Sequence, residues 1–492
     1  MDKEVNYADF LNCDKSLLIA PAGHGKTHSI TECVKLIDDK SLILTHSNAG
    51  VAALRDKLKH SKIDKGKYKI TTIDGFARTI ASSFDSKFSP DDPFCTILDK
   101  AIKLVNSNII RQSLEYNYRC LFVDEYQDCS AKQHEFIQLI SRDMPTHLFG
   151  DPLQGIFSFN GDIVSFENDL TDYTTFNELT TPHRWNQSKN PNLGEKILGF
   201  RKRILSNEPI NIATDKTCHL YVFNFPELDI HGQRTEYNKQ LQHIVRNYKE
   251  NRDLDSLLII MPEYHNGTMQ KGGEQDRLKL KSRIDFKDEL EVLLPVSRSS
   301  SKKLCQLIDT LIERKDSVIK KENRIKNDIL KKLFNLTSIN NWFNKDGLKR
   351  KNVLSDKEKS KLLSGDIERF YEYGTSSSLL DILKTTKNKM KVKLKNTGLY
   401  WDILTLLESA AISEKPLMEE FESRMNLQRR LGRKSKNKCI GSTLLTKGLE
   451  YDTVVILDAH RITCPKNLYV ALSRCCKMLI VFTETKTLNP NY

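Results

Sequence analysis

Short apolar runs that give way to polar turns recur along the chain. A strand of a parallel sheet is covered on both faces, so it is apolar throughout instead of alternating. Residues 27–37, which follow the run 16–19 after a short polar turn, instead place their apolar side chains at helical spacing. This alternation predicts an α/β fold of parallel sheets flanked by helices. The strands expected in it lie within 16–19, 120–123, 148–150, 218–225 and 256–262.

Positive charge is concentrated in one internal segment. The chain has 77 Lys and Arg against 64 Asp and Glu, a net charge of +13. Residues 311–440 hold 30 of the basic and 17 of the acidic residues, so they account for the whole surplus. The densest parts are KNKMKVKLK (387–395) and RRLGRKSKNK (429–438). Solvated helix faces usually mix signs, so this surplus favours a polyanionic partner.

Composition narrows the class of protein. At 492 residues, two to four domains are expected. No stretch approaches the roughly 18 consecutive apolar residues of a membrane span, and MDKEVNYADF (1–10) is too polar for a signal or transit peptide. The eleven cysteines include no C-x-x-C pair and are expected to be reduced structural thiols. We therefore expect a cytoplasmic protein with no membrane segment.

APAGHGKT (20–27) lies between the first expected strand and its helix, the context that a phosphate-binding loop needs. The general pattern G-x-x-x-x-G-K-[ST] begins with glycine, whereas this chain has Ala20 at the strand exit. Gly23 and Gly25 would let backbone N–H groups converge on phosphate at a helix N-terminus. Lys26 would reach the β- and γ-phosphates, and the Thr27 hydroxyl would bind Mg²⁺. The alternative is a glycine turn without function.

Two further turns supply acids and a sensor. In CLFVDEYQD (120–128), Asp124 is placed to hold Mg²⁺ through water and Glu125 to act as general base. In LFGDPLQ (148–154), Gln154 is a candidate γ-phosphate sensor. A strand end capped by acids is the structural alternative, but two adjacent carboxylates after an apolar run are costly without a cation. The three turns together predict an NTPase that uses ATP and Mg²⁺.

In this order the segments resemble the motifs of superfamily 1 helicases of the UvrD/Rep type. The family loop reads A-x-x-G-x-G-K-T, which explains Ala20, and DEYQD (124–128) matches DE-x-QD. The other matching segments are LTHSNAGVAALRDKL (44–58), TTIDGFA (71–77), GDPLQGIFSFNG (150–161), LTTPHRW (179–185), TKGLEYDTVVIL (446–457) and YVALSRCCKMLIVF (469–482).

The resemblance implies roles for individual residues. Arg184 and Arg474 resemble the two arginines that meet the γ-phosphate across a domain cleft, and Glu450 the carboxylate near the nucleotide sugar. It assigns catalysis to Lys26, Glu125, Gln154, Arg184 and Arg474, nucleotide binding to Ala22, Gly23, His24, Gly25, Lys26, Thr27, His28, His183, Gly448 and Glu450, metal binding to Thr27 and Asp124, and DNA binding to His46, Asn48, Phe76, Phe157 and Phe159.

The same resemblance implies two RecA-like P-loop domains. The first would span 1–190 with a reduced insert at about 80–113, and the second 191–295 with 437–492. A large, mostly helical basic insert would occupy 296–436. Such a protein moves 3′ to 5′ along single-stranded or tailed DNA by closing and opening its cleft.

Several positions depart from the family pattern. No Gln precedes the loop APAGHGKT, although the family reads adenine with a Gln about twenty residues before the loop lysine. His183 replaces the adenine-stacking Tyr, His46 an aromatic, and Asn160 an Arg. In its compact size and reduced first insert the chain also resembles the helicase subunit of Gabija, a two-component bacterial antiphage system, which would imply a nuclease partner. An RNA helicase is a third possibility.

Overall fold

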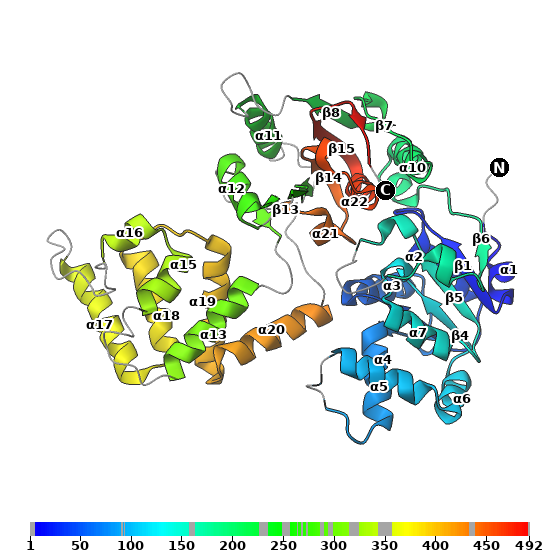
Figure 1. The fold of residues 1–492 in the computed structure, drawn as a ribbon, viewed down its shortest axis with the longest axis horizontal. Helices are drawn as coiled ribbons and strands as arrows, with labels where there is room; N and C mark the ends of the chain where they lie inside the picture. The colour runs from blue at the N-terminus through cyan, green and yellow to red at the C-terminus, as the bar shows by residue number, and fades with distance from the viewer. Residues whose placement is uncertain are drawn as a thin grey trace. The chain divides into compact units, whose positions relative to one another are not determined.

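The computed structural model describes residues 5–89, 92, 94–156, 163–225, 235–247, 256–262, 264–266, 269–271, 274–285, 290–293, 299–313, 324–342, 357–431 and 438–490. The chain divides into two compact units, one formed by residues 1–293 with 431–492 and the other by 294–430. Figure 1 shows two α/β layers in the first unit, each a parallel sheet with its helices, and helices in the described part of the second unit.

The first layer is a sheet of six parallel strands in the order β3-β2-β4-β5-β1-β6. Its strands are β1 (Lys15–Ile19), β2 (Ser41–Thr45), β3 (Tyr68–Thr72), β4 (Cys120–Val123), β5 (Thr146–Gly150) and β6 (Thr174–Phe176). Every residue of β2, β4 and β5 is buried. This agrees with apolar runs covered on both faces.

Successive side chains of a strand point to opposite faces, so each sheet face has its own core. Leu42 and Leu44 pack with one set of helices, and Ile43 packs with the other. The Ile43 side carries α1 (Tyr7–Asn12), α2 (Lys26–Lys35) and α3 (Asn48–His60). The Leu42 side carries α4 (Ile73–Phe84), α5 (Phe94–Val105), α6 (Asn108–Asn117) and α7 (Ala131–Ile140).

The second layer is also a sheet of six parallel strands, in the order β12-β13-β9-β14-β15-β8. Its strands are β8 (Leu220–Asn224), β9 (Leu257–Ile260), β12 (Glu291–Val292), β13 (Lys438–Gly441), β14 (Tyr451–Ile456) and β15 (Cys475–Thr483). Two parallel sheets covered by helices confirm the α/β prediction of two RecA-like domains.

Helices cover both faces of the second sheet. One core joins Leu258 and Val454 to α10 (Pro191–Leu205) and α22 (Pro465–Leu472), and the opposite core joins Ile259 and Val455 to α11 (Thr235–Asn247) and α12 (Glu274–Ile284). The smaller elements are α8 (Phe166–Asp169), α9 (His183–Gln187), α21 (Thr443–Thr446), the pair β7 (Ile210–Asn211) with β16 (Thr487–Leu488), and the pair β10 (Tyr264–Asn266) with β11 (Met269–Lys271).

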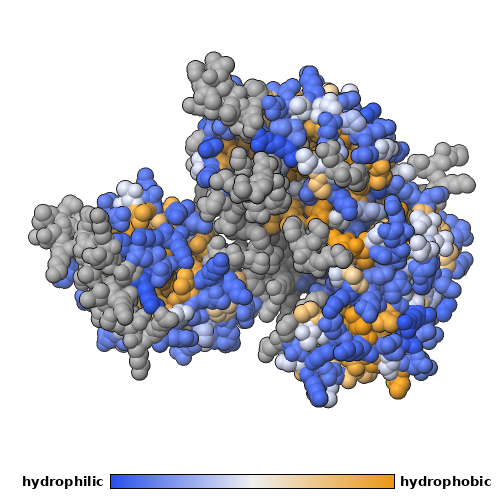
Figure 2. All heavy atoms as spheres, viewed as in Figure 1, coloured by the Kyte–Doolittle hydropathy of each residue, from blue (hydrophilic) through white to orange (hydrophobic). Residues whose placement is uncertain are grey.

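The described part of unit 294–430 is helical and has a core of its own, which includes Phe334, Phe370 and Tyr400. Its face in Figure 2 is mostly hydrophilic. The elements are α13 (Ser299–Glu313), η6 (Ile325–Leu330), α15 (Lys331–Leu333), α16 (Leu336–Asn340), α17 (Lys357–Tyr373), α18 (Ser376–Lys384), η7 (Thr385–Lys389), α19 (Thr397–Ser413) and α20 (Leu417–Leu431).

Two other expectations concern the chain as a whole. None of the helices within the described residues is both long and apolar enough to span a bilayer. All eleven cysteines are free thiols, and seven of them are buried. Burial raises the pKa of Cys33 and Cys120, so these neighbouring thiols stay protonated and unreactive.

Candidate nucleotide-binding site

The loop APAGHGKT has the backbone of a phosphate-binding turn. The N–H of Ala20 donates to the carbonyl of Gly150 (3.0 Å), which joins the loop to the end of β5. Gly23 and Gly25 both have a positive φ, of 75° and 99°, and Gly25 is the N-cap of α2. Left-handed glycines directly before a helix turn successive N–H groups toward one point, where an anion binds.

Lys26 lies against the two acids that follow β4. Its ammonium is 3.4 Å from Asp124 and forms an ion pair with Glu125. Burial opposes the charge on Lys26, but the two carboxylates outweigh this cost and raise its pKa above the ordinary value. Lys26 is thus a fixed cation at the loop, as binding of a triphosphate requires.

Asp124 fits a magnesium ligand. Burial is the largest influence on this carboxyl and raises its pKa to about 6. Its Oδ1 atom is buried and accepts no hydrogen bond, and the Lys26 ammonium lies 3.4 Å from it. A buried carboxylate in that state is stabilised further by a cation that coordinates it directly. Within the described residues no cluster of three or more His, Cys, Asp or Glu side chains could hold a metal alone. Mg²⁺ commonly takes one or two carboxylates and completes its shell with phosphates and water, so Asp124 suits it, and the role of Thr27 beside it stays a prediction.

Glu125 is held in an uncommon conformation. Its φ of 58° places a non-glycine residue in the left-handed region, which functional sites often retain at a cost in strain. The side-chain amide of Gln127 donates to Glu125, and the Gln127 oxygen accepts from the backbone N–H of Asp151 at 3.0 Å. Burial acts to raise the pKa of Glu125, but the positive charges of Lys26 and Lys447 outweigh this effect, so the pKa is lowered overall. The carboxylate is therefore ionised, as a general base must be, and Lys26 occupies it in this arrangement.

Gln154 and Arg474 connect the two sheets. Gln154 lies in η3 (Pro152–Gln154), directly after β5, and its amide donates to Asp151 at 3.0 Å. Its side-chain oxygen is 3.5 Å from a guanidinium nitrogen of Arg474, which precedes β15 in the second sheet. Burial and the neighbouring charge of Arg184 lower the pKa of Arg474 to about 10. Arg474 is thus a buried cation that faces the first sheet.

Arg184 is tied to both layers. Its backbone N–H donates to the carbonyl of Gly23 at 3.0 Å, within the phosphate loop. Its guanidinium donates to the carbonyl of Ser473 and lies 2.6 Å from the carboxylate of Glu450. In this arrangement Glu450 contacts an arginine, and its expected role near the nucleotide sugar stays a prediction.

Three histidines surround the loop. His24 is buried, donates from its Nδ1 atom to the Ala22 carbonyl (2.8 Å), and has an Nε2 atom with no hydrogen-bond partner. Burial lowers its pKa to about 4, so the ring is neutral. His183 lies over the loop, because a Cβ added to Gly25 would be 2.7 Å from the His183 ring. The rings of His28 and His183 are 5.7 Å apart.

Sequence reasoning missed a buried network that also joins the layers. Arg201 of α10 lies 3.0 Å from Asp151 and pairs with Glu178. The hydroxyl of Tyr469 accepts from the backbone N–H of Ala22 at 3.0 Å. Asp151 and Tyr469 stand inside quoted motifs, so a closer reading of those motifs could have found them. Arg201 stands in an ordinary amphipathic helix and gave no such signal.

The expected DNA-binding residues differ in their burial and contacts. Phe76 is only 2% exposed and packs against Tyr118 and Phe136, which places it in the core and not on a DNA-contacting surface. His46 is half-buried, with its Nε2 atom 3.3 Å from the Cys129 sulfur, and Asn48 opens α3. Their assignment stays a prediction. The remaining two, Phe157 and Phe159, lie outside the described residues.

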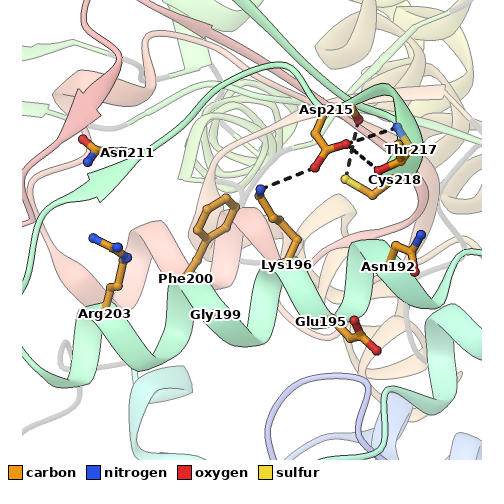
Figure 3. A pocket seen from close by; sticks show the side chains of 10 residues that line it. All are labelled: Asn192, Glu195, Lys196, Gly199, Phe200, Arg203, Asn211, Asp215, Thr217 and Cys218. Atoms are coloured by element: carbon orange, nitrogen blue, oxygen red, sulfur yellow. Dashed lines mark hydrogen bonds and ion pairs between the residues drawn. The ribbon is translucent and has the colours of Figure 1, made fainter.

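A separate depression of about 510 Å³ lies beside the outer face of α10. Figure 3 shows Lys196 and Phe200 of that helix on one side and Asp215, Thr217 and Cys218 on the other. Lys196 lies 3.4 Å from Asp215. None of the residues assigned to the nucleotide lines this depression, so it is distinct from the candidate site.

Comparisons with known proteins find helicases. Residues 92–174 match the UvrD/REP helicase N-terminal domain. An Acanthamoeba polyphaga mimivirus protein named as a putative ATP-dependent DNA helicase is 23% identical over 289 residues, 55% of this chain and 39% of the relative. An ATP-dependent helicase/nuclease protein from Lactococcus lactis is 26% identical over 223 residues, 43% of this chain and 17% of that protein.

The chain therefore spans well under half the length of these relatives. Among solved structures, an arterivirus nonstructural protein 10 (helicase) with DNA has 13% identity, covers 44% of this chain and 45% of its own, and reaches a TM-score of 0.26. That score is too low to add to the fold assignment. The findings are thus a match of residues 92–174 to a UvrD/REP helicase N-terminal domain and relatives that are named ATP-dependent helicases.

Proposed function

We propose that this chain is an ATP-dependent DNA helicase or translocase that hydrolyses ATP between its two parallel sheets. The observation that carries the proposal is the meeting of residues from both layers. Lys26, Asp124 and Glu125 lie together at the first sheet, and Arg474 reaches Gln154 from the second. A hydrolytic site completed by a second lobe is how such motors couple ATP to movement.

Each side chain has a definable task. Lys26 would leave its ion pair with Glu125 for the phosphates, which frees Glu125 to accept a proton from the attacking water. Arg474 and Arg184 would stabilise the charge that develops on the transferred phosphoryl group. Magnesium, when bound at Asp124 and Thr27, would neutralise phosphate charge. The substrate is ATP by resemblance, although His183 stands where the family stacks adenine on Tyr.

Movement along DNA would follow from opening and closing of the cleft between the two layers. ATP would hold the two layers together and hydrolysis would release them, so that a strand lying across both advances. The substrate strand would be single-stranded or tailed DNA, and the 3′ to 5′ polarity comes from the resemblance alone. Stacking on aromatic side chains tolerates any base, as a motor without sequence preference requires.

Exposed lysines in unit 294–430 support the hypothesis of a polyanionic partner. Lys389, Lys391, Lys393 and Lys395 are all exposed, and Met390 and Val392 between them are buried. Backbone hydrogen bonds from Asn335 to the Lys393 carbonyl (2.8 Å) and from Lys395 to the Leu333 carbonyl (2.9 Å) fix the second half of this lysine strip. Nearby in the sequence, the Lys387 ammonium lies 4.2 Å from the ring centroid of Trp401, which is 48% exposed. Exposed lysines suit phosphates, and an exposed indole suits stacking on bases.

The decisive experiment measures ATP turnover with DNA and RNA oligonucleotides, and unwinding of 3′-tailed and 5′-tailed duplexes. DNA-stimulated turnover with unwinding of 3′-tailed DNA is expected. Lys26→Ala should abolish turnover and leave a folded, DNA-binding protein. Turnover that persists in this variant would contradict the proposed site, and stimulation by RNA alone would identify an RNA helicase.

A second candidate function is a DNA-end-sensing ATPase that activates a partner nuclease, with little unwinding, as in Gabija-like antiphage defence. Two observations favour it. Only α5 and α6 follow α4 between β3 and β4 in the described residues, which leaves the first layer compact, and some relatives carry helicase/nuclease in their names. A stable complex with a nuclease would support this function, whereas strong unwinding by the chain alone would argue against it.

A further inference from the structure

Lys447 makes a buried contact between the two layers that none of the proposed steps uses. It directly follows α21 in the segment TKGLE of the second layer. Its ammonium forms an ion pair with Asp128 and donates to the backbone carbonyl of Gln154, both in the first layer. The Lys447 side chain is 7% exposed and that of Asp128 is 5% exposed. This contact is therefore shielded from solvent on both sides.

The two partners of Lys447 belong to the two turns that carry the chemistry. Asp128 closes η2 (Tyr126–Asp128), and its N–H donates to the carbonyl of Glu125 at 3.0 Å. Gln154 presents its carbonyl to Lys447 and its side chain to Arg474. One ammonium thus fixes the turn after Glu125 and the turn of Gln154 against each other, from the opposite layer.

The free-energy cost of burying two charges indicates that this contact has a role besides stabilising the fold. Moving an ammonium and a carboxylate out of water costs several kcal/mol per ion, and a buried pair often stabilises no better than apolar residues of the same size. The pair Lys477–Asp452 is a useful contrast. It lies within the second layer at 2.9 Å, and its lysine is 37% exposed. Such a pair loses little hydration and contributes little to stability.

We propose that Lys447 is a positioning residue, which couples docking of the second layer to ATP hydrolysis by holding Glu125 and Gln154 in place. The inference rests on the proposed function. Lys447 contacts the two turns and is not assigned to the phosphates, so its effect on hydrolysis runs through Glu125 and Gln154. When the layers separate, the ammonium withdraws and both turns lose their common anchor, so hydrolysis is confined to the docked state. A displacement of about 1 Å at such groups can reduce rate on the order of a hundredfold.

The test compares Lys447→Met, Lys447→Arg, the double variant Asp128→Asn with Lys447→Met, and the control Lys477→Met. Steady-state ATP turnover with saturating DNA and thermal unfolding are measured for each. We expect Lys447→Met to lower kcat by at least about tenfold and to change KM by less than about threefold. Lys447→Arg keeps the cation and should recover most of kcat, and Lys477→Met should match the wild type.

The double variant separates positioning from charge burial. Removing both ions relieves the unpaired carboxylate, so thermal stability should return, but kcat should stay low because the Gln154 carbonyl has lost its donor. Recovery of both stability and kcat would overturn the inference, as would a Lys447→Met protein with normal kcat. If the wild type itself turns over no ATP, the proposed function fails as well. A wild type that is active beside an equally active Lys447→Met refutes the role of Lys447 alone.

Discussion

The guanidinium of Arg474 lies 3.5 Å from the side-chain oxygen of Gln154, although 320 residues separate them in the chain. Gln154 extends from the end of β5 and Arg474 stands just before β15, so the contact joins the two parallel sheets. Gln154, which is suited to sensing phosphate, therefore contacts Arg474, which is suited to stabilising the charge of a transferred phosphoryl group. Changes to either group should therefore alter ATP turnover.

Arg474→Ala should lower ATP turnover by about 10³-fold or more, because an arginine that stabilises a transferred phosphoryl group contributes on that scale. The measurement is kcat in the presence of DNA. Arg203→Ala is a matched control, since Arg203 is an exposed arginine of α10 that donates to the carbonyl of Pro209. Equal activity of the two variants would exclude Arg474 from the hydrolytic step.

Glu125→Gln should lower turnover by about 10²-fold or more, the usual contribution of a general base. ATP affinity, measured by equilibrium binding, should be retained or improved, because one negative charge leaves the phosphate site. Glu167→Gln, at an exposed position on α8, should behave as the wild type. A loss of ATP binding in Glu125→Gln would mean that this residue builds the site and does not act as base.

Gly25→Ala should weaken nucleotide binding and destabilise the protein by about 1–3 kcal/mol, because alanine is strained at a φ of 99°. The new methyl group would also lie 2.7 Å from the His183 ring. Gly199→Ala is the control. It lies within α10 with nothing within 4 Å of the added atom, so it should stabilise by about 0.5–1 kcal/mol. Differential scanning fluorimetry with and without ATP distinguishes the two effects.

Acid should destabilise the first sheet through His147. This residue is buried in β5, its Nδ1 is 2.7 Å from the Ser16 hydroxyl, and burial lowers its pKa from 6.5 to about 4. The folded state therefore binds the proton more weakly than the unfolded state does. Stability is complete above pH 6.5 and falls as the pH drops from 6.5 toward 4. In denaturant titrations across this range, His147→Gln should show a smaller loss, and an unchanged pH slope would exclude His147 as the cause.

The lysine strip of unit 294–430 should carry part of the affinity for nucleic acid. Replacing Lys391, Lys393 and Lys395 by Gln should reduce the salt slope of single-stranded DNA binding by about 2, since each phosphate contact contributes about 0.7. The exposed lysines Lys302, Lys303 and Lys361 of the same unit are the matched control set. Fluorescence of Trp401, isolated by Trp401→Phe, reports whether its indole contacts DNA, and equal slopes for both lysine sets would disprove a localised strip.

Local sequence patterns predicted the strands and the loop well. A run such as 120–123 is apolar at every position because both of its faces are buried, and that property needs no knowledge of its neighbours. The expected strand at 16–19 is observed as Lys15–Ile19 for the same reason. Helix α2 begins at Lys26, where the glycines of the loop end. Each of these features is decided by residues close together in the chain.

Features that depend on distant residues could not be predicted in this way. Phe76 belongs to the core because Tyr118 and Phe136 fold against it, which no neighbouring residue reveals. The partners of Lys447 and Tyr469 lie hundreds of residues earlier, at Asp128 and Ala22. Arg201 is buried and forms an ion pair with Asp151, whereas an arginine on an amphipathic helix normally faces solvent.

The strand order of the second sheet has a consequence for how the protein is made. Strand β9 lies between β13 and β14, and β8 pairs with β15. Strands β8 and β9 therefore cannot pair with these neighbours until the residues after 437 have been synthesised. All of unit 294–430 is translated in the meantime. A nascent chain of about 430 residues would therefore expose unpaired, apolar strand edges while its helical unit is already complete, and such edges invite aggregation. Ribosome stalling within this window should make the product dependent on chaperones.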